Sequence, residues 1–548
     1  MPRVINRRPT LLLACLAALH CPLPARAQDA APAEAAGESF DVWEIRVVGN
    51  GVLANREIEE VVYPFLGPQR TIATVEQARV ALETRYRDRG YGTVFVDIPE
   101  QDVDGGIVRL RVTEGKLDRI RVVGSRYYSN RAIRNRLPSL QRGEVLQLTQ
   151  FQEQLTALNR QSRDRSIVPV LRAGSRPGNV DVDLKVTDKL PMHATAEVNN
   201  KYTANTSHSR ANLTWSFDNL WQRMHSLSLQ YQTAPEEPRE ARVLAGTYVL
   251  PVTDSGHMFA VFAVDTDSEF TTLGAEFNEF GVIGRGRIYG ARYIAPLAGT
   301  NSYFHNVTFG ADYKDFQEVI TQEDGEPAAT PISYINWSFG YTGTLHSAAA
   351  LTMFDLSANL GIRGLANSPE EFHFKRFSGQ ANKGEPDYFY IRGSARQERP
   401  LVAGLALFGQ LSGQYSPHAL ISNEQFAIGG AEGVRGYLES QALGDYGASG
   451  TLELRWGLPQ SWLGASPRQA TVFVFADAGI IALQYALKDQ VDETTLASWG
   501  VGVNLSGFFT MRGVGGLSSS LSWARALRDA KDVDAGDSRL HFQVGYGF

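Results

Sequence analysis

Cysteine is almost missing from this chain, and the positions of the few that occur are informative. Its two cysteines, Cys15 and Cys21, both lie within the first 27 residues. Residues 28–548 therefore cannot contain a disulfide framework or a thiolate metal site. Long apolar segments are missing as well: after residue 27 no run of about 18 apolar residues occurs, so we expect no transmembrane helix. If the chain spans a membrane, it must do so as a closed barrel, the other structure that satisfies every backbone hydrogen bond in lipid.

A basic excess is also missing. The formal net charge is −6, and it becomes −10 when the four arginines of residues 1–27 are set aside. Nucleic-acid binding needs a concentrated basic face, so we expect no nucleic acid partner. The chain has no Walker loop, nucleophile elbow, HExxH or CxxC motif. We therefore expect no enzyme, no cofactor and no metal.

Residues 1–27 have the features of a secretory signal peptide. Three arginines precede a short apolar segment at residues 11–19, and Ala25 and Ala27 place small residues at the two positions that a signal peptidase reads. The apolar segment is shorter than the ~20 residues that a spanning helix needs. We therefore expect export, with a flexible, alanine-rich tail at residues 28–39.

A tandem repeat with an offset of 75 residues fills the N-terminal third. The pentapeptide Ile-Arg-Val-Val-Gly occurs at residues 45–49 and again at 120–124. Three further matches support the repeat, and they align residues 55–58 with 130–133, 74–77 with 149–152 and, after a slip of one residue, 110–114 with 184–188. Four matches in register predict two copies of one structural unit.

Each copy has the pattern of a β-α-α-β-β unit. In the first copy we expect strands at residues 43–48, 93–98 and 107–113. We expect one helix at residues 55–62 and a second that runs from a capping box at Thr74 and Gln77 to Gly90. In the second copy we expect strands at residues 117–123, 167–171 and 182–187. We expect one helix at residues 130–137 and a second that begins at a capping box at Thr149 and Gln152. This order resembles the POTRA domain, so we expect POTRA 1 at residues 40–115 and POTRA 2 at residues 116–189. The open edge of a three-stranded sheet can accept an extended peptide; the alternative is that both units are spacers.

From about residue 190 the apolar period changes to two. For example, Leu452, Leu454 and Trp456 alternate with polar residues. One apolar face and one polar or glycine face suit lipid and a watery lumen, and they predict a transmembrane β-barrel of about 16 antiparallel strands at residues 190–548. Four polar stretches indicate longer loops, at residues 321–330, 366–386, 488–495 and 525–538.

The last strand alternates in the same way. Apolar side chains occupy every second position at Phe542, Val544, Tyr546 and Phe548. This pattern resembles the C-terminal signal that the outer-membrane assembly machinery of Gram-negative bacteria reads. With the signal peptide, it implies an outer-membrane location, with the N-terminal units in the periplasm.

Two short motifs complete the pattern. One is Val434-Arg435-Gly436-Tyr437, and the other contains Phe475, Asp477 and Gly479. Behind two POTRA-like units and before a terminal phenylalanine, they resemble the outer-membrane transporters of two-partner secretion, the haemolysin and haemagglutinin secretion-activation family. The resemblance implies that the first motif tips a loop folded back into the barrel, and that the second lies on a barrel strand. Family members often carry an N-terminal plug helix, which we do not expect here because residues 28–39 have no apolar stripe.

The two motifs contain residue types that can pair with each other inside a barrel. A cation inside a barrel needs a partner, and an arginine–carboxylate pair can be bidentate. We therefore expect Arg435 to pair with Asp477 in the lumen; the alternative is a solvated arginine at a glycine-rich turn.

Three functions are open from the sequence. The first is an exporter that captures an unfolded partner protein, by family resemblance a large β-helical adhesin or cytolysin, and passes it through the barrel. The second is an insertase that assembles other barrels, but such relatives usually carry three or more POTRA units. The third is a passive porin, which leaves the repeat without a purpose.

Overall fold

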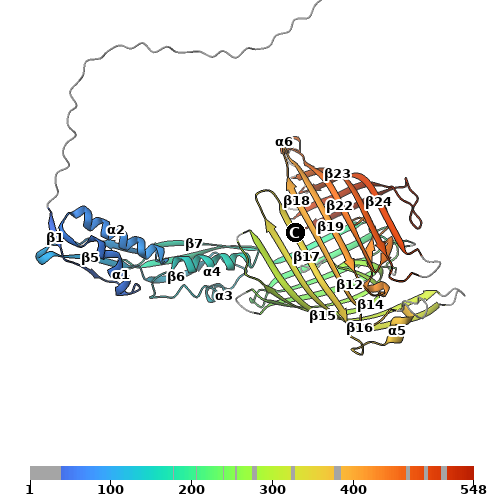
Figure 1. Cartoon of the computed structure of the whole chain (residues 1–548), viewed down its shortest axis with the longest axis horizontal. Helices are drawn as coiled ribbons and strands as arrows, with labels where there is room; N and C mark the ends of the chain where they lie inside the picture. Colours follow the sequence, from blue (N-terminus) through green and yellow to red (C-terminus); the bar gives the residue numbers. More distant parts are fainter. Residues whose placement is uncertain are drawn as a thin grey trace, which may run out of the picture. The chain divides into compact units, whose positions relative to one another are not determined.

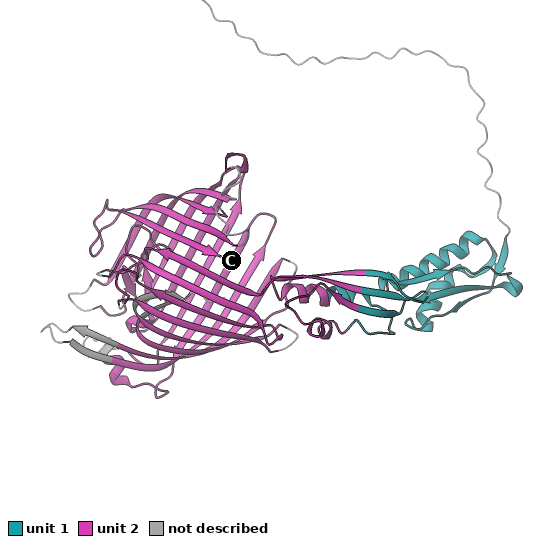
Figure 2. Ribbon diagram, turned by 180° about the vertical axis from the view of Figure 1, so that it is seen from behind, with its two compact units in different colours: residues 1–120, 139–153, 171–182 teal, residues 121–138, 154–170, 183–548 magenta. Residues whose placement is uncertain are grey.

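The computed structural model describes most of the chain and separates it into two compact units, which are coloured in Figure 2. The described residues are 39–176, 178–204, 206–238, 240–252, 256–273, 280–300, 302–321, 327–375, 384–463, 469–486, 491–507 and 515–548. The expected signal peptide and all but the last residue of the expected tail lie outside them. The first unit contains the described residues of Met1–Ile120, Ser139–Glu153 and Leu171–Val182, and the second contains Arg121–Pro138, Gln154–Val170 and Asp183–Phe548.

The N-terminal repeat folds as two POTRA-like α+β copies, whose element order Figure 1 follows. The elements of the first copy are β1 (Phe40–Val42), β2 (Glu44–Val48), α1 (Asn55–Val62), η1 (Tyr63–Phe65), β3 (Gly67–Arg70), α2 (Ile72–Asp88), β4 (Val94–Asp97), η2 (Asp104–Gly106) and β5 (Ile107–Glu114). The sheet order is β2-β5-β4, with β2 parallel and β4 antiparallel to β5. The apolar face expected on α2 is confirmed, since Val75, Ala78, Leu82 and Tyr86 are buried.

The second copy repeats this plan. Its elements are β6 (Leu117–Val123), α3 (Asn130–Asn135), α4 (Leu148–Arg160), β7 (Arg165–Ala173) and β8 (Val180–Asp188), with sheet order β6-β8-β7.

The expected capping boxes are wrong in both copies. The helix α2 begins after Thr71, which has extended backbone angles, so Thr74 lies inside the first turn. In α4 the side-chain oxygen of Gln147 accepts a hydrogen bond from the amide of Gln150 at 2.6 Å, which makes Gln147 the capping residue. The sequence reasoning also missed β1 and β3, which pair with each other outside the main sheet.

The repeated pentapeptide has a steric cause at its last position. Gly49 has φ 95°, and a Cβ atom there would lie 2.3 Å from the carbonyl oxygen of Val112. Gly124 has φ 92°, and its Cβ would lie 2.6 Å from the carbonyl oxygen of Val186. Only glycine fits a position where the backbone is left-handed and a neighbouring strand is this close.

Each copy also has a carboxylate at the same position, at the end of its last strand in the chain. Glu114, at the end of β5, accepts hydrogen bonds from the amides of Gly51 and Val52 at 2.6 and 2.9 Å. Asp188, at the end of β8, accepts hydrogen bonds from the amides that follow Gly124, including that of Tyr127 at 2.8 Å. Burial by itself raises the pKa of Asp188, but these amide donors and a serine hydroxyl hold it below its ordinary value. In both copies this carboxylate fixes the loop after the first strand.

Residues 192–547 form a closed barrel of sixteen strands among the described residues, so the expected fold class is confirmed. The strands in chain order are β9 (Met192–Asn199), β10 (Arg210–Leu220), β11 (His225–Thr233), β12 (Arg242–Pro251), β13 (Met258–Leu273), β14 (Phe280–Pro296), β15 (Tyr303–Thr321), β16 (Pro327–His346), β17 (Leu351–Gly361), β18 (Phe389–Pro400), β19 (Leu405–Tyr415), β22 (Tyr446–Gly457), β23 (Gln469–Ala482), β24 (Glu493–Ser506), β25 (Gly516–Ala526) and β26 (Ser538–Gly547). Neighbours are antiparallel, and β26 pairs with β9 to close the ring.

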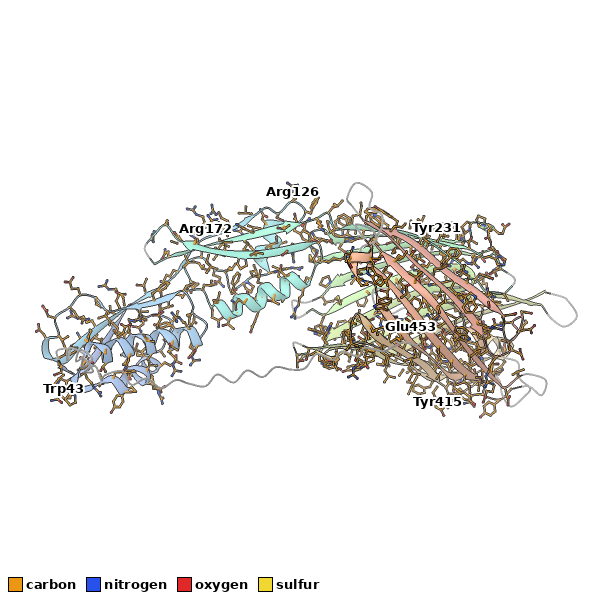
Figure 3. All side chains as sticks on the ribbon, turned by 90° about the horizontal axis from the view of Figure 1, so that it is seen from above. Trp43, Arg126, Arg172, Tyr231, Tyr415 and Glu453 are labelled. Carbon is orange, nitrogen blue, oxygen red and sulfur yellow. The ribbon has the colours of Figure 1, made fainter. Side chains whose placement is uncertain are left out.

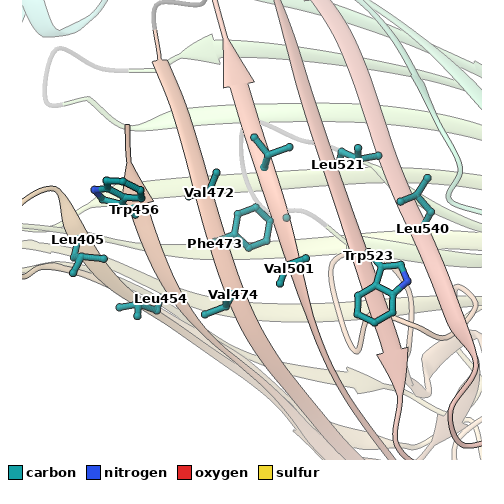
Figure 4. A pocket seen from close by; sticks show the side chains of 12 residues that line it. Leu405, Leu454, Trp456, Val472, Phe473, Val474, Val501, Leu521, Trp523 and Leu540 are labelled. Carbon is teal, nitrogen blue, oxygen red and sulfur yellow. The ribbon is translucent and has the colours of Figure 1, made fainter. Parts of the chain in front are cut away.

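The outer face of the barrel is apolar. Large exposed side chains occupy the outward positions of the alternating strands, and Tyr231 and Tyr415 in Figure 3 are two of them. Figure 4 shows a shallow apolar hollow on this face, where Leu454, Val474 and Val501 come from neighbouring strands. A surface of this kind is stable against lipid and not against water. Within the described residues, no helix is both long and apolar enough to cross a membrane.

The two longest connections, residues 362–388 and 416–445, lie at one end of the barrel, because each follows a strand that runs in the same direction. The first of them contains α5 (Pro369–Lys375), and residues 527–537 lie at the same end. The expected loops at residues 321–330 and 488–495 are partly wrong, because residues 321, 327–330 and 493–495 belong to strands β15, β16 and β24, while residues 322–326 and 488–490 lie outside the described residues. At the opposite end lies α6 (Gln460–Leu463).

Candidate functional site

The connection between β19 and β22, residues 416–445, folds into the barrel. It contains η3 (Ser422–Glu424) and a small hairpin of β20 (Phe426–Ile428) with β21 (Ala442–Gly444). Gly429 and Gly430 have φ 107° and 91°, values that let the chain turn sharply after β20. This hairpin tip carries the first motif.

Arg435 is held by two carboxylates. Its Nε donates to Asp477 Oδ2 and its Nη2 to Asp477 Oδ1, each at 2.8 Å, so this pair is bidentate. Its Nη1 donates to Glu453 Oε1 at 2.7 Å, and its backbone amide donates to Asp477 Oδ2 at 3.1 Å. The three side chains are 8%, 7% and 0% exposed for Arg435, Glu453 and Asp477. The structure therefore brings together the two residues that the sequence reasoning paired.

The strand geometry places this cluster inside the barrel. On β23 the side chain of Val474 is exposed, whereas Phe475 and Asp477 are buried, as alternation requires. The guanidinium carbon of Arg435 lies 3.4 Å from the centroid of the Phe475 ring, so the aromatic residue of the second motif makes a cation–π contact with the arginine.

The remaining motif residues pack the tip against the inner wall. Val434 and Tyr437 are fully buried. A Cβ atom at Gly479 would lie 3.0 Å from Val434 Cγ2, so glycine there makes room for the tip. Gly436 has φ 93°, and its amide donates to His541 Nε2 at 3.0 Å. That acceptor requires a neutral imidazole with its proton on Nδ1.

Tyr437 links the tip to two further segments. Its hydroxyl oxygen lies 3.0 and 2.8 Å from the carbonyl oxygens of Ala497 and Arg528, either of which can accept its single proton. These contacts involve strand β24 and the connection after β25. All seven residues of the two motifs thus converge on one cluster.

The sequence reasoning missed Glu453 and the ion pairs beyond it. Arg455 Nε donates to Glu453 Oε2 at 2.8 Å, and Arg455 Nη1 donates to Glu398 Oε2 at 2.9 Å. In the sequence, Glu453 lies between the outward-facing Leu452 and Leu454. This alternation indicates an inward-facing carboxylate and could have identified Glu453. Asp477 and Glu453 thus both bind Arg435, and Glu453 also binds Arg455.

A second anchor near the base of the loop was also missed. Glu424, in η3, is 2% exposed and accepts hydrogen bonds from Lys314 Nζ and from the hydroxyls of Tyr334 and Tyr390. Lys314, Tyr334 and Tyr390 come from β15, β16 and β18. A buried carboxylate is stable here because an ammonium and two hydroxyls satisfy it. The loop is therefore fixed to the wall at two separate places.

The C-terminal strand closes the barrel. Phe542, Val544 and Tyr546 lie at alternate positions of β26, which pairs with β25 and with β9. Phe548 continues the seam, because its amide donates to Ala194 O at 3.0 Å and its carbonyl accepts the Ala194 amide at 3.2 Å. A change at these positions therefore affects barrel closure as well as any recognition signal.

The charged groups of this cluster fix the position of the loop. Buried ion pairs with bidentate geometry fix one arrangement of a loop, and their separation leaves uncompensated charge. Of the side chains described, one group of His and carboxylate ligands is close enough to share an ion, and it lies away from this loop.

Comparisons with known proteins agree with this architecture. The model of the haemolysin secretion/activation protein family ShlB/FhaC/HecB matches residues 178–505, and the ShlB-type POTRA domain matches residues 40–115. The outer membrane transporter CdiB of Dickeya dadantii is 23% identical over 480 residues, covering 86% of this chain and 80% of the relative. The heme/hemopexin transporter protein HuxB of Haemophilus influenzae is 20% identical, covering 86% and 82%.

A solved structure shows the same fold. CdiB from Escherichia coli superposes with a TM-score of 0.62 at 20% identity, covering 95% of this chain and 92% of that structure. Because the family model matches more than half of the residues, from the second POTRA-like copy into strand β24, the chain belongs to the haemolysin secretion/activation family of two-partner secretion transporters in the outer membrane.

Proposed function

We propose that this transporter serves one dedicated exoprotein, which it captures unfolded in the periplasm and passes outward through its barrel. The observation that carries the proposal is the loop at residues 416–445, folded into the barrel and fastened through Arg435 to Asp477 and Glu453. We take residues 40–115 and 116–189 as the two capture units and residues 190–548 as the pore, with large β-helical adhesins or cytolysins as the class of cargo.

The capture step uses an edge of the first sheet. Strand β2 lies at one edge, and β4 lies at the other, where Arg79 Nη1 donates to Val96 O at 3.1 Å and occupies part of the edge. Trp43, just before β2, and Val48, the last residue of β2, present exposed apolar side chains. An extended cargo segment added to β2 gains main-chain hydrogen bonds and buries these side chains.

The capture step is tested with a photocrosslinking amino acid. Trp43 and Tyr63 are both exposed aromatic residues of the first unit, 59% and 74% exposed, and only Trp43 adjoins β2. We expect a crosslinker at position 43 to trap the exported protein, and the same crosslinker at position 63 to trap none. Equal yields at both positions contradict capture by β2.

The export function is tested by deleting the gene in its host and comparing the proteins of the culture fluid and the outer membrane. We expect one large protein to disappear from the fluid while other barrels keep their levels. A joint decline of many barrels identifies an insertase instead. Unchanged inventories in both fractions contradict dedicated export.

The part that the loop plays is tested with a reversible crosslink. Residues 28–548 contain no cysteine, and a Cβ atom added at Gly479 would lie 3.0 Å from Val434 Cγ2, so cysteines at these two positions are close enough for a disulfide. We expect the oxidised pair to stop secretion and reduction of the same protein to restore it. Equal secretion in both states removes loop movement from the mechanism and leaves the lock with a purely structural role.

A further inference from the structure

A group of three ligand-bearing side chains lies far from the loop, where the second POTRA-like copy meets the barrel. Asp164 follows α4, His193 lies near the start of β9, and Asp218 lies near the end of β10. His193 Nε2 is 2.9 Å from Asp164 Oδ2 and 3.8 Å from Asp218 Oδ2. All three potential ligand atoms lie within 4.8 Å of one another.

The three side chains are held in place by their surroundings. The backbone carbonyl of Asp164 accepts the Lys189 amide at 2.8 Å, and the backbone amide of Asp218 donates to Pro191 O at 2.8 Å. Asp164 is 6% exposed, and the side chains of His193 and Asp218 are 23% and 20% exposed. The site is thus partly closed, with its donors on three fixed segments.

The turn that follows Asp218 is fastened to the same copy. The side-chain amides of Asn219 and Gln222 donate to the carbonyl oxygen of Tyr127 at 3.3 and 3.0 Å, and Gln222 accepts the Ser129 amide at 2.8 Å. These neutral hydrogen bonds fix the distance between the two sides of the joint. The Asp–His–Asp group is therefore preorganised and does not depend on a mobile segment.

We propose that Asp164, His193 and Asp218 form a binding site for a divalent transition-metal ion of the zinc class. A neutral imidazole can donate one hydrogen bond from Nε2, so by itself it leaves two carboxylates sharing a single donor. A tetrahedral zinc site with ligand distances near 2.1 Å places its ligand atoms about 3.4 Å apart, and the two observed separations lie on either side of that value. An imidazole nitrogen favours such an ion over magnesium or calcium.

The consequence of the site is mechanical. One ion ties the segment after α4 to β9 and β10, the two strands through which the chain enters the barrel. Water occupies the remaining coordination position, because the chain supplies three ligands. A bound ion thus strengthens the attachment of the segment after α4 to strands β9 and β10.

The experiment uses the purified full-length barrel in detergent, stripped with a chelator and titrated with Zn²⁺. We expect one equivalent to bind, and H193Q and D218N each to weaken binding at least tenfold. H208Q is the matched control, since His208 is exposed in a loop at the other end of β10. Heat-modifiable migration in gel electrophoresis verifies that each variant is folded.

Two results overturn the proposal. One is the absence of zinc binding to the wild-type protein at about 100 µM free ion. The other is full zinc binding by both H193Q and D218N, which places the ion elsewhere. X-ray absorption at the zinc edge supplies an independent measurement, in which we expect one imidazole with oxygen ligands.

Discussion

Removal of the Arg435 side chain is the perturbation whose outcome the structure predicts in most detail. In Arg435→Ala, Glu453 keeps Arg455 as a partner, whereas the fully buried Asp477 loses its bidentate cation. Removing one partner of a buried ion pair costs about 3–5 kcal/mol, and each 1.4 kcal/mol is about a factor of ten in an equilibrium. We therefore expect the population of the released loop to rise roughly 100- to 4,000-fold.

The assay follows the reaction of one introduced cysteine with a maleimide. Leu438 is buried when the tip is docked, so a cysteine there reacts only from the released state. We expect Arg435→Ala to accelerate this reaction by the stated factor, as long as docking and release are fast compared with labelling. A cysteine at the exposed Leu365, in another connection at the same end, controls for reagent access and should react at an unchanged rate.

The decisive comparison is a double variant. Adding Asp477→Asn to Arg435→Ala neutralises the orphaned carboxylate, so labelling should become slower than in Arg435→Ala alone. In the wild-type background the same Asp477→Asn change should accelerate labelling, because it weakens the pair. If Asp477→Asn accelerates labelling in both backgrounds, or if Arg435→Ala leaves the rate unchanged, the lock is not the electrostatic one described here.

Three further predictions concern stability. Glu424→Gln leaves the partly buried Lys314 without its carboxylate, and we expect a loss of about 3–5 kcal/mol at this anchor, seen as a lower temperature of heat-modifiable unfolding. The pKa of Asp188 is depressed in the folded state, so this carboxylate stabilises the fold above its unfolded pKa of about 3.9, and the stabilisation is lost as the pH falls through the lower folded pKa. Amide exchange in the loop that Asp188 holds, corrected for intrinsic rates, should therefore lose protection in acid. The variant Asp188→Asn should remove this pH dependence. Gly124→Ala should destabilise the second copy by more than the ~1 kcal/mol strain of a left-handed alanine, whereas Gly143→Ala, at φ 87° with no atom within 4 Å, should cost only that strain.

Each of these predictions has a result that contradicts it. Unchanged unfolding of Glu424→Gln would show that the tyrosine hydroxyls alone satisfy the site. Protection that falls equally with acid in Asp188→Asn would place the titrating group elsewhere. Equal losses of stability in Gly124→Ala and Gly143→Ala would mean that the close carbonyl of Val186 moves aside at no cost.

Much of the fold could be predicted from local patterns. The helix at Asn55–Val62 and the strand at Leu117–Val123 lie at the residues that the sequence predicted, because apolar spacing and flanking turns fix such elements locally. The helix starts were wrong, because Thr74 and Thr149 both match a capping pattern, whereas the residues just before the first helical turn, Thr71 and Gln147, stand earlier in the chain. The strands β1 and β3 were missed because each is short and pairs only with the other.

The sequence by itself determined the two repeated units, the alternating barrel and the residues of the two motifs, since repeats and period-two patterns are properties of neighbouring residues. The tertiary structure alone decided what meets what inside the barrel. Alternation shows that Glu453 faces inward, but not that it lies beside Arg435, and nothing local connects Glu424 with Lys314, 110 residues away. The reason is physical: a strand pattern specifies the face of each side chain, whereas the register of sixteen strands and the path of the loop specify its neighbours.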